Sequence, residues 1–185
     1  DFDMVRNASD AAKAKGINKD ISIKTANFIM EVAVLYDVDV IVFEHLDRKG
    51  KKRGSKKQKL HLWRSQYVQS IVEHKAHRLG MRISRICAWG TSRLAYDGSG
   101  IVLRGKDAGF TCYSLCQFPN GKVYNCDLSA SYNIGSRYFV REIIKSLPVR
   151  ERLALEAKVP EVAKRSTCTL STLINLNAEI MSFVA

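Results

Sequence analysis

The sequence of 185 residues lacks several features that mark a protein as membrane-bound or secreted. No apolar run approaches the roughly 20 residues that a membrane-spanning helix needs, and no secretory signal heads the chain. Its five cysteines are an odd number in a chain long enough to bury a core, which argues against a disulfide framework and favours a reducing compartment. These absences predict a cytoplasmic protein with no membrane among its partners.

Internal repeats are also missing, and the composition excludes wholesale disorder. Hydrophobic residues make up 46% of the chain and charged residues 26%, as in folded globular proteins. The length fits one domain, or one domain with an appendage. Because the first residue is Asp1 rather than methionine, we expect the chain to be a fragment of a longer protein.

Acidic side chains are nearly absent from one stretch, residues 48–86, which holds 13 Lys or Arg and a single acid, Glu73. The whole net charge of +12 therefore falls within it. Such a run repels itself unless a polyanion neutralises it, and each neutralised phosphate releases counterions. We expect nucleic acid to be the partner; a solvated or nuclear-targeting tract is the alternative. The candidate contacts are Arg48, Lys49, Lys51, Lys52, Arg53, Lys56, Lys57, Lys59 and Arg64.

The hydrophobic pattern predicts an α/β core. Residues 19–36 and 60–79 carry apolar stripes at helical spacing, whereas residues 38–43 and 81–87 have the apolar character of short buried strands. A strand, a helix and a second strand in that order form a crossover unit.

The second half of the chain is predicted to hold a ribbon and further helices. Residues 110–116 and 122–126 would pair through the turn signal at residues 119–121. A third helix is expected over residues 127–147, and a good amphipathic helix ends the chain. On the apolar side of the third helix we expect Leu128, Tyr132 and Phe139.

Two carboxylates stand where metal chemistry could use them. Glu44 follows a predicted central strand, at the strand end where open α/β sheets bind ligands, and Asp127 begins the third helix. Mg²⁺ takes oxygen ligands, and a pair of such ions activates water and stabilises the leaving oxygen of a phosphodiester. The alternatives are that Glu44 simply ends a strand at the surface and that Asp127 simply caps its helix.

Three ordered segments resemble a known family. They are Ile41–Leu46 (IVFEHL), Gly90–Arg93 (GTSR) and Asp127–Ile134 (DLSASYNI). Together with the basic loop they look like the RuvC-like nuclease half of the TnpB proteins, the OrfB-type transposases related to type V CRISPR effectors. The resemblance covers residues 37–139.

This resemblance implies an RNase H-like (RuvC-like) mixed sheet flanked by helices, and an RNA-guided DNA endonuclease encoded by a prokaryotic mobile element. Glu44 and Asp127 would be the second and third carboxylates that hold Mg²⁺ or Mn²⁺. The basic loop would lie along nucleic acid, with DNA and a guide RNA as partners, and Arg93 could clamp a phosphate. The nuclease core would span residues 1–147, with a zinc-ribbon-like insertion over 88–126 and a helical appendage over 148–185.

The sequence departs from that family in three places. No Asp-x-Gly strand is present near Asp1, so the first catalytic Asp and the early strands would lie upstream or be absent, and the fragment alone is expected to be inactive. Without the early strands, the sheet would have exposed edges, through which two copies of the chain could pair as a homodimer. The zinc ribbon is degraded: Cys112, Cys116 and Cys126 remain as three ligands of a four-ligand site, so we expect no zinc. Ser129 replaces an expected Asn.

A second reading fits the same residues. The chain could be a nucleic-acid-binding module of the same fold that lost its chemistry with the first carboxylate and the zinc ligands. A third reading is a basic structural component of a ribonucleoprotein. Substitution of Glu44 or Asp127 would then have no effect on function.

Overall fold

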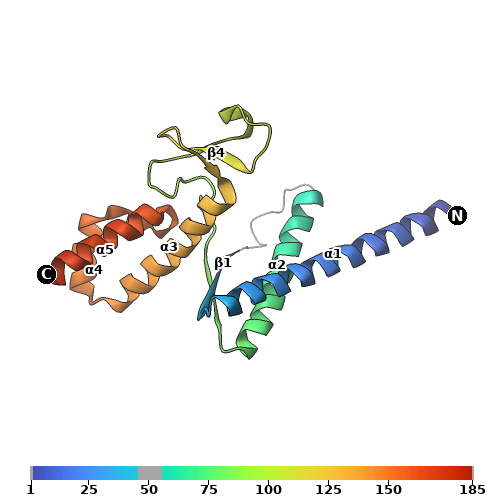
Figure 1. The fold of residues 1–185 in the computed structure, drawn as a ribbon, viewed down its shortest axis with the longest axis horizontal. Coiled ribbons are helices and arrows are strands. Elements are labelled where there is room, and N and C mark those ends of the chain that lie inside the picture. Colours follow the sequence, from blue (N-terminus) through green and yellow to red (C-terminus); the bar gives the residue numbers. More distant parts are fainter. Residues whose placement is uncertain (1, 46–55, 185) are drawn as a thin grey trace. The chain divides into compact units, whose positions relative to one another are not determined.

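The computed structural model describes residues 2–45 and 56–184, with side chains for residues 12–45, 64–164 and 166–182. The chain divides into two compact units, Asp1–Ser84 and Arg85–Ala185. In chain order the elements are α1 (Phe2–Leu35), β1 (Val40–His45), α2 (Lys56–Arg78), β2 (Arg82–Cys87), β3 (Leu103–Arg104), η1 (Gly105–Ala108), β4 (Leu115–Gln117), β5 (Val123–Asn125), α3 (Cys126–Ser146), α4 (Val149–Lys158), η2 (Pro160–Thr167) and α5 (Leu170–Val184), as Figure 1 shows.

The predicted crossover unit is confirmed in the first half of the chain. β1 and β2 form a two-stranded parallel sheet, and α2 connects them. Main-chain pairing begins where the Arg82 amide donates to the Asp39 carbonyl oxygen at 2.8 Å. The chain is therefore of mixed α/β class, as the hydrophobic pattern predicts.

The core of the first unit forms where α1 packs against α2. Small and flexible side chains let the two helices approach closely, and β-strand side chains such as Ile41 and Phe43 cover the contact from the side. The buried members are Ala26, Met30, Ala33, Val72, Ala76 and Met81. This core follows directly from the apolar stripes of the two predicted helices.

Helix α1 begins much earlier than its apolar stripe predicts, at Phe2 rather than near Lys19. Residues 12–17 are exposed, so packing does not hold this part of the helix. Its sequence is rich in alanine and lysine, which have high intrinsic helix propensity. Propensity extends the helix beyond the segment that packing requires.

The second unit opens with a small antiparallel ribbon in the order β3-β4-β5. Cys116 of β4 pairs with Arg104 on one side and Tyr124 on the other. The predicted turn is confirmed, because the Phe118 amide donates to the Lys122 carbonyl oxygen at 2.8 Å. The first ribbon strand is shorter than the predicted residues 110–116. Before it, the Arg104 guanidinium donates to the Tyr113 carbonyl oxygen at 3.1 Å.

Helix α3 is confirmed, but its predicted apolar face packs only near the end of the helix, where Ile143 and Leu147 lie against the C-terminal core. Its aromatic and leucine side is exposed, with Leu128, Tyr132 and Phe139 each more than two-fifths accessible. The side that is buried carries small and polar residues, namely Cys126, Ser129, Ala130, Asn133, Ser136, Arg137 and Val140. Polar side chains can occupy a buried face only when hydrogen bonds satisfy them, so the partners of these residues define the unit.

The end of the chain is helical, as predicted. Side chains of α4, η2 and α5 bury an apolar cluster together with Val140 of α3. Its other fully buried members are Leu155, Val159, Val162, Cys168 and Leu176. Residues 149–184 therefore share a core with the helix that begins at the Asp127 motif.

Candidate functional site

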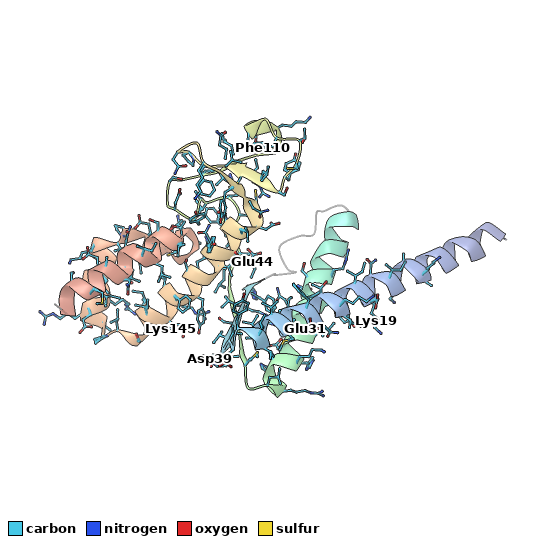
Figure 2. The ribbon with its side chains drawn as sticks, in the orientation of Figure 1. Lys19, Glu31, Asp39, Glu44, Phe110 and Lys145 are labelled. Atoms are coloured by element: carbon cyan, nitrogen blue, oxygen red, sulfur yellow. The ribbon has the colours of Figure 1, made fainter. Side chains whose placement is uncertain are left out.

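Glu44 lies near the end of β1 and is half-buried (Figure 2). The buried Gln69 of α2 donates from Nε2 to the main-chain oxygen of Glu44 at 3.2 Å. This bond fixes the strand end against the helix that follows it. Because the backbone of Glu44 is fixed, the position of the Cα atom that carries its side chain is well defined.

Asp127 lies in the first turn of α3, where its side chain is exposed. The residue that caps the helix is Asn125, whose Oδ1 accepts the amides of Asp127 at 2.9 Å and Leu128 at 3.0 Å. The reading of Asp127 as a simple helix cap is therefore wrong. Among the residues that the structure describes, the Asp127 carboxylate has no hydrogen-bond or ion-pair partner, so it is available to a ligand.

One buried side chain joins two of the three segments that carry the family resemblance. They are the start of α3, which holds Asp127, and the segment Gly90–Arg93, called the Thr-Ser turn below. Asn133 donates from Nδ2 to the carbonyl oxygens of Thr91 at 3.0 Å and Leu94 at 2.8 Å. Asn133 has no exposed surface, and Thr91 is almost fully buried. The turn that carries Arg93 is thus anchored on α3, two helical turns from Asp127.

Glu44 and Asp127 lie in different units, each of which is described by itself. Their meeting at one metal ion therefore stays a prediction. In residues 2–45 and 56–184, no group of three His, Cys, Asp or Glu side chains gathers to hold a metal. Each carboxylate taken alone suits Mg²⁺ as an oxygen ligand on a fixed element.

Most of the predicted nucleic-acid contacts cannot be placed. Arg48, Lys49, Lys51, Lys52 and Arg53 lie outside the described residues. Lys56, Lys57 and Lys59 belong to the first turns of α2, and their side chains are outside the described set.

Arg64 and Arg93 are described. Arg64 is half-buried and lines a cavity of about 420 Å³ together with Ser22 of α1, Phe43 of β1 and Gln69 of α2. Arg93 is exposed directly after the Thr-Ser turn. Both guanidinium groups can therefore reach solvent, where a phosphate could meet them.

Among the described residues, the three ribbon cysteines do not gather into one group of metal ligands. Cys116 and Cys126 are buried beside the apolar Ala95, in the segment where the family has its first cysteine pair. Burial, together with the neighbouring Cys126 thiol, raises the pKa of Cys116 to about 11. Cys112 lies apart and exposed, and a hydrogen bond from Ser114 lowers the pKa of its thiol.

Arg137 is a functional candidate that sequence reasoning missed. Its buried guanidinium donates to the carbonyl oxygens of Cys87 at 2.8 Å, Trp89 at 2.7 Å and Cys168 at 3.1 Å, and also to that of Ser166. The group thus ties the end of β2 to the residues before α5. A signal was present, because Arg137 follows Asn133 by one helical turn and so shares its face.

An aromatic cluster on the ribbon was also missed. The Tyr96 ring lies 5.2 Å from Tyr124 and 5.1 Å from Tyr132, and the Lys122 ammonium stands 4.9 Å from the Tyr96 and Tyr124 ring centres. These residues come from three separated segments, so their meeting could not be read from sequence spacing. The cation–π contacts of Lys122 join the ribbon turn to Tyr96, and the ring contact between Tyr96 and Tyr132 joins Tyr96 to α3.

Compared with known proteins, the chain matches no protein-family model and no curated protein. Across residues 2–45 and 56–184, no helix has both the length and the apolar composition that crossing a membrane would require.

Proposed function

We propose that this chain is the RuvC-like nuclease segment of a transposon-encoded, RNA-guided DNA endonuclease similar to the TnpB proteins. Its fold would be RNase H-like, with β1 and β2 as neighbouring strands of a larger sheet. The proposal draws on the three ordered segments of the sequence and on the local structure around each of them.

The observation that carries the proposal is the attachment of the Thr-Ser turn to the Asp127 helix through Asn133. Two segments that the resemblance treats as parts of one site are bonded to each other, although more than thirty residues separate them. A second observation supports the proposal: Asn125 caps the helix, so the Asp127 carboxylate is not needed as the cap. A carboxylate that lies at a capped helix end and is not used as the cap supports a functional role.

Glu44 and Asp127 would hold the metal ion. When bound, Mg²⁺ would supply Lewis-acid stabilisation of the phosphate oxygens and lower the pKa of a water molecule. The chain's own residues would orient the substrate. Gln69 fixes the strand end that bears Glu44, and Asn133 holds the turn that presents Arg93 toward solvent.

Metal binding by the 185-residue chain tests the first part of the proposal. We expect Mn²⁺ to broaden the NMR signals around Glu44 and Asp127 at the same ion concentration, because one ion would be shared. Glu44→Gln or Asp127→Asn should abolish the broadening at both places. The matched controls, Glu31→Gln and Asp107→Asn, change exposed carboxylates of the same units and should leave it intact. Independent broadening at the two sites would contradict a shared ion.

Cleavage tests the second part, in a form of the protein that cuts DNA. Glu44→Ala or Asp127→Ala should leave DNA and guide-RNA binding unchanged and reduce cleavage to background, since a metal ligand is lost but no nucleic-acid contact is. If either variant cut DNA at the normal rate, the assignment of that residue would be wrong.

A nucleic-acid-binding module without catalysis is the second candidate. The ribbon core favours this candidate. Apolar side chains such as Ala95 and Phe118 surround Cys116 and Cys126, where the TnpB-like proteins would have further zinc ligands. In this case Mn²⁺ would broaden neither carboxylate region, and binding of DNA or RNA would be unaffected by the metal.

A further inference from the structure

A small cavity in the second unit is lined by three arginines. Its volume is about 250 Å³, and its walls are Arg85, Ile86 and Cys87 of β2 with Arg137 and Arg141 of α3. This volume lies at the lower end of ligand pockets, which suits a compact group such as a phosphate rather than a large molecule. The lining residues include no carboxylate.

The positive charge of two of these arginines is held in place. The four bonds from Arg137 to carbonyl oxygens orient its guanidinium. Arg141 donates from Nη1 to the Arg85 carbonyl oxygen at 3.2 Å, and its Nε meets the Glu142 carboxylate at 2.8 Å. Glu142 is not among the residues that line the cavity.

Fixed guanidinium groups around a small cavity are well suited to a tetrahedral oxyanion. The planar fork of arginine matches the oxygen spacing of phosphate, and a group held in advance loses little entropy on binding. Arg85 also closes the basic stretch that contains all of the chain's excess charge.

We propose that this cavity binds a backbone phosphate of a nucleic-acid strand. Arg85 and Arg141 would contact the phosphate, and Arg137 would position the cavity wall and add charge. The inference rests on the proposed nucleic-acid function for the source of the phosphate, whereas the anion site itself rests only on the cavity and its arginines.

Cys87 gives a direct measure of the cavity, because its exposed thiol lies in the wall. Anionic and cationic methanethiosulfonate reagents would be compared at Cys87 and, as an internal reference, at the exposed Cys112. The arginines should raise the anionic-to-cationic rate ratio at Cys87 about tenfold or more relative to Cys112. Inorganic phosphate, at constant ionic strength, should protect Cys87 from the anionic reagent and leave Cys112 unprotected.

Variants separate the arginines from general surface charge. Arg85→Gln alone changes an exposed side chain, and the double variant with Arg141→Gln removes two of the three lining charges. Both should lower the rate ratio and the protection at Cys87, the double variant more. Arg150→Gln, on the exposed surface of α4, should change neither. Equal protection in the wild type and the folded Arg85→Gln variant would overturn the anion site.

A short single-stranded DNA identifies the source of the phosphate. It should protect Cys87 at lower phosphate-equivalent concentration than inorganic phosphate does, because neighbouring phosphates bind the same chain. Protection by inorganic phosphate but not by DNA would overturn the nucleic-acid assignment. Glu44→Gln and Asp127→Asn should leave this protection unchanged, so that failure of the metal site and failure of the phosphate site can be told apart.

Discussion

The two units of this chain are held together by different means. In the first unit, α1 and α2 meet through alanine, valine and methionine side chains, and Gln69 supplies a polar tie to the strand. In the second unit, buried polar side chains of α3 reach main-chain oxygens far away in sequence: Asn133 reaches the Thr-Ser turn, and Arg137 reaches both the end of β2 and the segment before α5. Apolar contact tolerates small adjustments, whereas such directed bonds demand one geometry.

The difference teaches where a rigid frame for a site can come from in a small protein. A turn held by two hydrogen bonds to a buried amide has little freedom to move. The second unit therefore carries the better-defined candidate groups, Asp127, Arg93 and the arginine cavity, on a frame of polar ties. The three predictions below test whether apolar packing holds the first unit and polar ties hold the second. They are given in order of expected effect.

Removal of the Arg137 guanidinium should be the most damaging change. Arg137→Met keeps the length of the side chain but leaves four main-chain oxygens without their donor. We expect the second unit to lose about 3 kcal/mol or more of unfolding free energy, because a buried acceptor that loses its donor costs about 1–3 kcal/mol. Hydrogen exchange of peptides from residues 85–184, followed in urea, measures the loss.

The control for this change is Arg150→Met, which alters an exposed arginine of the same unit and should stay within about 0.5 kcal/mol of wild type. Exchange in residues 12–45 should be unchanged in both variants. A loss for Arg137→Met no larger than that of the control would show that the polar ties do not hold the unit.

Truncation of Met30 should weaken the first unit by apolar loss alone. Met30 is about 6% exposed in the contact between α1 and α2, and Met30→Ala should cost about 3 kcal/mol, within the usual range for buried methionine. Ile17→Ala on the exposed part of α1 is the control and should cost little. Urea denaturation with exchange readout gives both values. An equal effect in the two units would mean that they unfold as one, which would remove the contrast.

Two polar residues on the same buried face of α3 should respond in opposite ways. Asn133→Ala leaves two buried carbonyl oxygens without their donor and should cost about 2 kcal/mol. The Ser129 hydroxyl is also buried, and among the described residues it has no hydrogen-bond partner. Ser129→Ala should therefore be neutral or stabilise the unit by up to about 1 kcal/mol.

Thermal melts of these two variants, with the exposed Ser131→Ala as a reference, measure the difference. A clear loss of stability in Ser129→Ala would reveal a partner for its hydroxyl, such as an ordered water.

Apolar periodicity predicted β1, β2, α2 and the packed part of α1, and in the second unit it predicted α3 and α5. The stripes of α1 and α2 contain the residues that meet in the core, and the runs around Val40 and Ile83 are the strands. Periodicity failed for the early part of α1, where helix propensity acts without packing. An apolar stripe cannot predict a helical segment that forms through intrinsic helix propensity and does not pack against a core.

Periodicity also failed on α3, for a different reason. Leu128, Tyr132 and Phe139 gave the helix an apolar side, yet the buried side is the one whose polar groups find distant carbonyl oxygens. Those partners lie more than thirty residues away, so no local pattern contains them. The candidate residues Glu44 and Asp127 could be chosen from the sequence. That Asn125 rather than Asp127 caps the helix was seen only in the structure.

The bonds of Arg137 also constrain when the protein can finish folding during its synthesis. Two of its four carbonyl partners, those of Ser166 and Cys168, belong to a segment made about thirty residues after the arginine itself. Until that segment leaves the ribosome, the guanidinium cannot be buried without losing water for which it has no replacement. A nascent chain stalled before Ser166 should therefore keep the end of β2 loose and open to proteases, and release of the last helix should close it in a single late step.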